Sequence, residues 1–156
     1  MKIAKPRFEN GKALLLAGLS GRYTGETNSQ IPALWQRFGP EYFGRVPGQV
    51  GMVSYGVCYN FAPEAVFDYL AGVEVTSLAG VPAALTQLRI DPQRYAVFAH
   101  DGHVSKLGEN WMGIFNEWLP KSGHEFAGGT SYERYGADFD PKTGLGGMEI
   151  WVALKN

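Results

Sequence analysis

The feature that most constrains the fold of this chain is an internal repeat. The stretch GLSGRYTGETNSQIPALWQRF, which begins at Gly18, aligns without a gap to AHDGHVSKLGENWMGIFNEWL, which begins at Ala99. Identities are few, chiefly Gly21 with Gly102, but the apolar patterns agree. In both copies a short apolar run predicts a strand, and apolar residues spaced along one face predict a helix after it. Self-similarity of this kind predicts two copies of one structural unit.

The repeat continues beyond the helices. VSYGVCY resembles the segment that contains SYERY, and AGVEV, residues 71–75, resembles GGMEI, residues 146–150. Each unit therefore reads strand, helix, strand, strand. We expect an α+β fold, a tandem βαββ repeat with pseudo-twofold symmetry and a mostly antiparallel sheet. The expected helices cover 28–39 and 105–119, and each ends at a proline-containing segment. We expect a single domain over 1–156, with repeat one at about 12–76, a connector at 77–92 and repeat two at about 93–153.

Composition excludes several classes of protein. The chain has 156 residues, a net charge of −1 and 45% hydrophobic residues, which is typical of a globular domain rather than a disordered one. The near-neutral charge argues against direct nucleic-acid binding, and no apolar run is long enough for a membrane span. With one cysteine, Cys58, no internal disulfide can form. We expect a cytoplasmic protein. The 21 glycines and 13% aromatic residues favour a surface built for close contact with flat ligands.

The order and spacing of several segments resemble the GyrI-like, or AraC effector-binding, family. The segments are IPALWQRF, YGVCYNF, DYLAGVEV, YAVFAHDGHVSKLGENW, NEWLPKSGHE, SYERYGADFDPKTG and MEIWVAL. The resemblance implies a central ligand cleft between the two repeats. Known bacterial members sense ligands for transcription regulation, bind bulky aromatic cations, protect DNA gyrase from a toxin, or hydrolyse cyclopropane-containing cytotoxins. No DNA-binding module is evident in the sequence, so we expect a stand-alone member that would need a separate partner to regulate transcription.

Glu133 is the candidate for a charged group in that cleft. Strand alternation places Ser131, Glu133 and Tyr135 on one face. The repeat aligns Glu133 with Gly56, so one half offers a carboxylate where the other offers no side chain, which would leave room for a ligand. The resemblance also implies that this glutamate lies in the cleft. The alternative is a solvated strand glutamate, or one paired with Arg134 or Lys142.

Aromatic residues complete the expected ligand site. Tryptophan and tyrosine faces attract cations by about 0.5–2 kcal/mol each. Aromatic residues spaced along one face of a helix also serve as ordinary core packing, and this alternative stays open. The ligand-binding residues that we expect are Glu133, Trp111, Tyr55, Gly56, Tyr135, Phe115, Tyr59, Tyr69 and Trp35.

Three functions fit the sequence. The first is binding of a bulky apolar or cationic aromatic small molecule, of the multidrug type. The second is hydrolysis of an electrophilic cytotoxin by Glu133 and Tyr135, and the third is protection of a protein partner such as DNA gyrase. We expect no cofactor and no metal, because His100, His103 and His124 do not have the spacing of a metal site.

Overall fold

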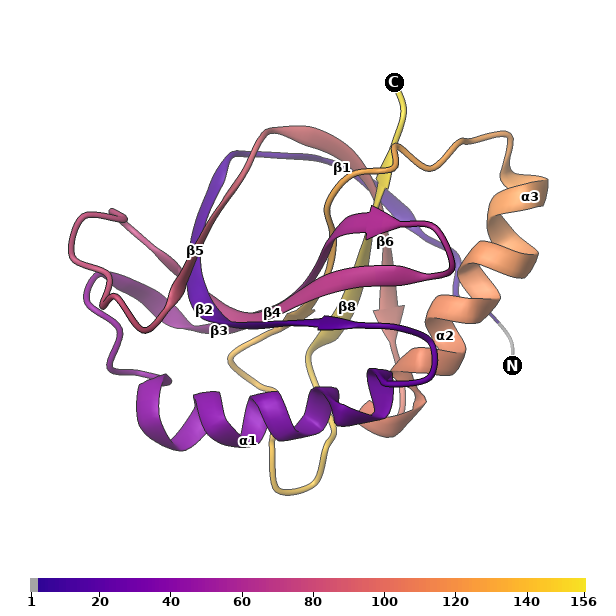
Figure 1. The fold of residues 1–156 in the computed structure, drawn as a ribbon. Coiled ribbons are helices and arrows are strands. Elements are labelled where there is room, and N and C mark those ends of the chain that lie inside the picture. Colours follow the sequence, from indigo (N-terminus) through magenta and orange to yellow (C-terminus); the bar gives the residue numbers. More distant parts are fainter. Residues whose placement is uncertain (1–2) are drawn as a thin grey trace.

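The computed structural model describes residues 3–156 and consists of one eight-stranded antiparallel sheet with helical segments from each half (Figure 1). The predicted α+β fold with a mostly antiparallel sheet is confirmed. The strand order is β1-β6-β8-β7-β3-β4-β2-β5. The strands are β1 (Arg7–Gly11), β2 (Leu14–Tyr23), β3 (Gln49–Ala62), β4 (Val66–Val75), β5 (Thr86–Ile90), β6 (Gln93–His100), β7 (Ser131–Tyr135) and β8 (Met148–Leu154).

The strand order carries the symmetry of the sequence repeat. Each strand has a counterpart in the other half: β1 corresponds to β5, β2 to β6, β3 to β7 and β4 to β8. When every strand is replaced by its counterpart, the strand order becomes the observed order read from the other end. The exchange maps the central pair, β3 and β7, onto itself. In that pair Gly56 lies directly opposite Glu133. The two positions that the repeat makes equivalent are therefore neighbours at the centre of the sheet.

Two strands were not expected from the sequence. Strand β1 lies before residue 12, and β5 lies inside the stretch 77–92, which we expected to be only a connector. Each five-residue strand pairs with the opposite half, β1 with β6 and β5 with β2. Both are short edge strands. RFENG shows no clear alternation, and TQLRI alternates over only five residues, too short a run to predict a strand.

The helices extend past the prolines that we expected to end them. A 3₁₀ turn (η1, Asn28–Gln30) leads into α1 (Ile31–Tyr42), which contains Pro40 near its end. In the second half a 3₁₀ turn (η2, Val104–Lys106) is followed by α2 (Leu107–Gly113), a π-helix (η3, Ile114–Trp118) and α3 (Leu119–Ser122), which contains Pro120. Pro40 lies in the last turn, and the π-helix shifts the hydrogen bonding just before Pro120, so neither missing N–H breaks its helix.

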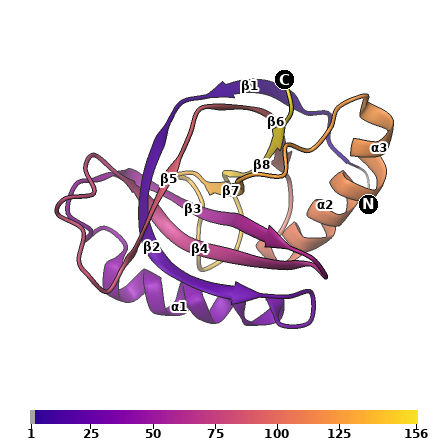
Figure 2. The ribbon, with the colours of Figure 1, turned by 45° about the horizontal axis from the view of Figure 1, so that its top comes forward.

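The two faces of the sheet have different roles. Figures 1 and 2 show α1 and the α2–α3 segment on one side of a strongly curved sheet. On the helix side, Phe38 from α1 belongs to the same core cluster as Val73, and Ile114 from η3 belongs to the same cluster as Phe98. The opposite, inward-curved side is filled by a third buried cluster that includes Tyr95 and Tyr132. Among residues 3–156, no helix is long and apolar enough to cross a membrane.

Candidate ligand-binding site

Glu133 lies on the helix side of β7 and accepts three hydrogen bonds from aromatic residues. Its Oε1 accepts from the Tyr69 hydroxyl at 2.9 Å and from the Tyr135 hydroxyl at 2.8 Å. Its Oε2 accepts from the indole N–H of Trp111 at 2.8 Å. Glu133 is half-buried, so the carboxylate is embedded in protein but retains some accessible surface. Neither a pairing with Arg134 nor one with Lys142 is needed to satisfy it.

Each helix reaches the carboxylate through one tryptophan. Trp111 from α2 contacts it directly, whereas Trp35 from α1 donates its indole N–H to the Tyr69 hydroxyl at 3.0 Å. That hydroxyl in turn donates to Glu133. The ring of Trp35 also meets the ring of Tyr135 edge to face, with centroids 5.3 Å apart. Glu133 is therefore the polar centre that joins both helices to the middle of the sheet.

Burial and hydrogen bonding act on the charge of this group in opposite directions. Burial raises the pKa of Glu133 above its ordinary value, although the hydrogen bonds from Trp111, Tyr135 and Tyr69 favour the ionised form. Burial and the nearby carboxylate raise the pKa of Tyr69 and of Tyr135 well above the ordinary value, so both hydroxyls remain protonated donors. Glu133 is thus a carboxylate held in place by neutral donors, and within residues 3–156 no cation is hydrogen-bonded to it.

Gly56 is required at its position, but not because it leaves an open space. A Cβ at residue 56 would overlap the Tyr69 hydroxyl and would lie 2.7 Å from Glu133 Oε1. The room beside Glu133 that we predicted from the repeat is thus occupied by the hydroxyl of Tyr69. Cys58, two residues further along β3, lies on the same face, and burial raises the pKa of its thiol well above the ordinary value. This thiol is therefore not an activated nucleophile.

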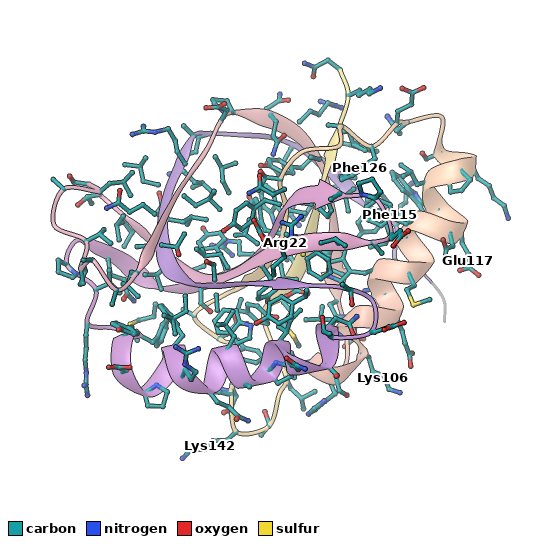
Figure 3. All side chains as sticks on the ribbon, in the orientation of Figure 1. Arg22, Lys106, Phe115, Glu117, Phe126 and Lys142 are labelled. Carbon is teal, nitrogen blue, oxygen red and sulfur yellow. The ribbon has the colours of Figure 1, made fainter. Side chains whose placement is uncertain are left out.

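A circuit of aromatic rings runs from one side of the carboxylate to the other. Trp111 stacks on Phe115, with ring centroids 6.1 Å apart, and Phe115 meets Phe126 edge to face at 5.1 Å. Figure 3 shows Phe115 and Phe126 side by side near the α2 segment. From Phe126 the circuit continues to Phe61, with ring centroids 5.7 Å apart, and from Phe61 to Phe67 at 6.5 Å. It then runs from Phe67 to Tyr23 at 6.3 Å and from Tyr23 to Tyr69 at 6.4 Å. Tyr69 returns to Glu133 and closes the circuit.

Four members of this aromatic circuit were missed by the sequence analysis: Tyr23, Phe61, Phe67 and Phe126. Tyr23 ends β2, Phe67 lies near the start of β4, and Phe61 lies near the tip of the β3–β4 hairpin. Phe126 lies between α3 and β7, where no periodic pattern exists. The only available signal was that each is a large aromatic residue close to the end of an expected element. Phe61 is 44% exposed, so its position is not explained by core packing alone.

Tyr55 and Tyr59 do not belong to this site. Tyr55 precedes Gly56, so strand alternation directs it to the opposite face of the sheet, where its ring meets that of Tyr132. Tyr59 packs against the same cluster. The prediction that both residues share a site with Glu133 is wrong, whereas the structure brings Trp111, Trp35, Tyr69, Tyr135 and Phe115 together on the Glu133 side.

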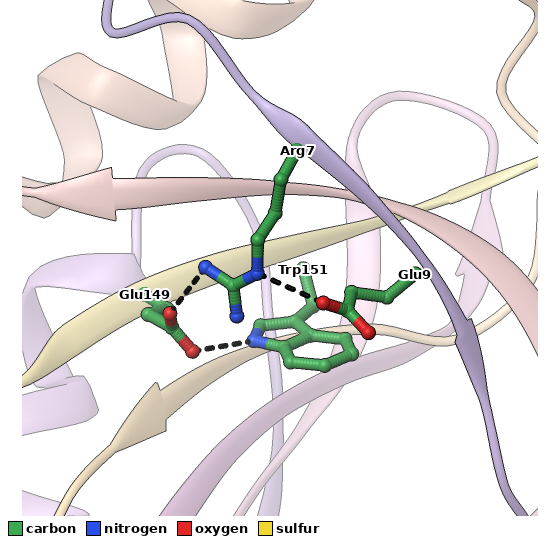
Figure 4. A network of polar contacts seen from close by, with 4 residues as sticks. All are labelled: Arg7, Glu9, Glu149 and Trp151. Atoms are coloured by element: carbon green, nitrogen blue, oxygen red, sulfur yellow. Dashed lines mark hydrogen bonds and ion pairs between the residues drawn. The ribbon is translucent and has the colours of Figure 1, made fainter.

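The opposite face also has its own polar network, which is partly exposed and involves no residue of the Glu133 site. Arg7 donates to Glu149 at 2.7 Å and to Glu9 at 3.0 Å, and Trp151 donates its indole N–H to Glu149 at 3.1 Å (Figure 4). Trp151 stacks on Tyr132 with ring centroids 5.4 Å apart. This network ties β1 to β8. Glu149 is a useful control for Glu133, because it is also a strand glutamate that accepts a hydrogen bond from a tryptophan but lies on the opposite face of the sheet.

The fold defines a class of small α+β domains built from two βαββ repeats. The chain belongs to the family of GyrI-like small molecule binding domains, whose model matches residues 4–155. The transcriptional regulator BrlR of Pseudomonas aeruginosa is 33% identical over 119 residues, which is 76% of this chain but 43% of the regulator. The chain thus spans less than half of the length of that relative.

Solved structures share the fold at low sequence identity. SAV2435 bound to tetraphenylphosphonium has a TM-score of 0.76 and 19% identity, over 97% of this chain and 94% of that protein. An integron cassette protein of Vibrio cholerae has a TM-score of 0.75 and 18% identity, over 98% and 97% of the two chains. A hydrolase from Listeria innocua has a TM-score of 0.50 and 9% identity, over 99% and 94%. At these identities the likeness concerns the fold alone.

Proposed function

We propose that this GyrI-like domain is a multidrug-type receptor that binds bulky aromatic cations at Glu133. The observation that carries the proposal is a half-buried carboxylate whose three hydrogen-bond donors are all neutral aromatic residues. A buried negative charge without a paired cation is costly, and a cationic ligand would remove that cost. A delocalised organic cation suits the site best, because the surrounding aromatic faces favour it and its desolvation costs less than that of a compact ion.

The aromatic circuit supports the same ligand class. Its members supply ring faces and edges rather than hydrogen bonds, which suits ligands that share shape and charge but not a hydrogen-bonding pattern. In this structure the donors of Glu133 are in direct contact with it, so a bulky ligand must displace at least one of them. Trp111 is the natural candidate, because it is half-buried whereas Tyr69 and Tyr135 are buried. The binding of tetraphenylphosphonium by SAV2435 makes this cation a suitable first probe.

Tryptophan fluorescence tests the proposal directly. Tetraphenylphosphonium is expected to change the emission of Trp111 and Trp35 saturably and to bind at least about fivefold more tightly than triphenylphosphine oxide, a neutral aryl compound. The expected ratio follows from about 1–3 kcal/mol for a charge-assisted contact. Equal affinity for the two compounds would show that charge is not recognised, and no saturable change with either would remove the receptor proposal.

Hydrolysis of an electrophilic toxin is the second candidate. The observation that favours it is that the Tyr69 and Tyr135 hydroxyls both bond to Oε1 of Glu133, so a proton donor and a proton acceptor lie side by side. Binding requires only a charge and aromatic surfaces, whereas hydrolysis also requires a positioned water, which is why we rank binding first. Turnover of a cyclopropane-type electrophile by the wild type, lost in Glu133→Gln and in Tyr135→Phe, would replace the receptor proposal with this one.

A further inference from the structure

The N-terminal segment of the chain packs against the helix that carries Trp111. Ile3 is half-buried against the core cluster of the second half, and it lies very close to Gly113 of α2. A Cβ on residue 113 would overlap the end of the Ile3 side chain. Ile3 also lines a surface groove together with Glu117 and Lys121. Figures 1 and 2 show the chain leading into β1 past the α2–α3 segment. Glycine at position 113 therefore makes room for a side chain of the N-terminal segment.

This contact and the ligand site lie on different flanks of the helix. Trp111 donates to Glu133 and stacks on Phe115, so these two rings mark the flank that faces the carboxylate. Successive residues of an α-helix are rotated by about 100°, so Gly113 lies about 200° around the axis from Trp111 and faces away from the carboxylate. Figure 3 shows Phe115 and Glu117 on different sides of this segment. The helix is thus held between Glu133 on one flank and the N-terminal segment on the other.

The N-terminal segment is anchored to the sheet close to Ile3. Strand β1 pairs with β6 along its whole length, and its first residue, Arg7, donates to Glu149 at 2.7 Å. Phe8 meets His124, which follows α3, with ring centroids 5.0 Å apart. Only residues 4–6 separate Ile3 from this anchor. Because its attachment is this short, Ile3 resists a movement of the helix away from Glu133.

We propose that Ile3 is a positioning residue for the ligand site, which acts through Gly113 to keep Trp111 on Glu133. This inference rests on the proposed function, in which a bulky cation displaces Trp111. The packing of Ile3 opposes that displacement, so loss of the Ile3 contact is expected to raise the affinity for the cation. By linkage, a bound cation weakens the contact between Ile3 and Gly113 to the same extent.

Two variants remove this contact from opposite sides. Ile3→Ala deletes most of the side chain, and Gly113→Leu fills the position that Ile3 occupies. The matched controls are Leu88→Ala, at a half-buried position in β5, and Gly108→Leu, on the same helix, where an added Cβ meets no atom within 4 Å. We expect both test variants to bind tetraphenylphosphonium at least about fivefold more tightly than the wild type, which is the lower end of typical couplings. Both controls should bind as the wild type does. A merely structural role of Ile3 would not tighten binding.

A second measurement uses only the wild type and so does not depend on a variant folding. The protein is labelled at the δ1 methyl groups of isoleucine, and NMR spectra are recorded with and without tetraphenylphosphonium. The Ile3 signal is expected to move toward its position in the urea-unfolded protein, whereas that of Ile90, which is buried at the end of β5, stays in place.

The outcomes separate this inference from the receptor proposal. Cation binding by the wild type with an unmoved Ile3 signal, or without tighter binding by Ile3→Ala, would overturn the positioning role and leave the receptor intact. Failure of the wild type to bind tetraphenylphosphonium would overturn the receptor proposal and this inference with it.

Discussion

Glu133→Gln is expected to weaken binding of tetraphenylphosphonium by about 1–3 kcal/mol, the range for loss of a charge-assisted contact, while affinity for triphenylphosphine oxide changes little. Glutamine keeps the size of the side chain and removes its charge. It also presents an N–H group to donors that now bond to Glu133, so one of Trp111, Tyr69 and Tyr135 loses its acceptor. Isothermal titration calorimetry with both compounds measures the effect.

Glu149→Gln is the matched control for this prediction. Glu149 is also a strand glutamate that accepts from a tryptophan indole, but it lies on the other face of the sheet and pairs with Arg7. The control should bind tetraphenylphosphonium as the wild type does. If both substitutions weaken binding equally, the effect comes from net charge rather than from the Glu133 site. If neither does, Glu133 is a structural residue.

Gly56→Ala is expected to destabilise the fold by about 1–3 kcal/mol, the usual cost of overpacking a filled position. The added methyl group would overlap the Tyr69 hydroxyl and crowd Glu133 Oε1. Tyr69 would then have to move and would lose its bonds to Glu133 and to Trp35, so cation binding should change as well. Urea denaturation gives the change in the free energy of unfolding, and the fluorescence titration gives the change in affinity.

Gly39→Ala supplies the comparison for Gly56→Ala. Gly39 lies in α1 with no atom within 4 Å of an added Cβ, so alanine should be neutral or should stabilise the helix by up to about 1 kcal/mol. The two variants add the same methyl group at the centre of the site and at a helix surface. A Gly56→Ala protein as stable as wild type would mean that the hydroxyl of Tyr69 is free to move, and that the contacts around Glu133 are looser than described.

The centre of the site could be predicted because the repeat aligned Glu133 with Gly56, and equivalent positions near a symmetry axis come together. Helical spacing also placed Trp111 and Phe115 on one side of the second helix. Strand alternation also explains why the prediction for Tyr55 is wrong. Since Gly56 faces the site, its neighbour Tyr55 must face away. The same alternation along β3 places Tyr59 on the face opposite Glu133 as well.

The remaining features depend on tertiary contacts that no local pattern encodes. Phe126 lies in an irregular segment, and Phe61 lies near a hairpin tip where Asn60, Glu64 and Ala65 adopt left-handed backbone conformations. Phe61 and Phe126 become part of the aromatic circuit only because the β3–β4 hairpin of the first half reaches the helical segment of the second half. The edge strands β1 and β5 are likewise stabilised by pairing with the opposite half, so their own sequences carry little signal.

A crystal structure of the complex with tetraphenylphosphonium would show directly where the cation binds. We expect it to lie on the helix side of the sheet, against Glu133, with aromatic rings of the circuit around it. Trp111 is expected to have left its hydrogen-bonded position, because the donors in contact with the carboxylate leave no room for the ligand. A cation bound instead on the opposite face, beside Tyr55 and Tyr132, or bound without contact to Glu133, would contradict the account.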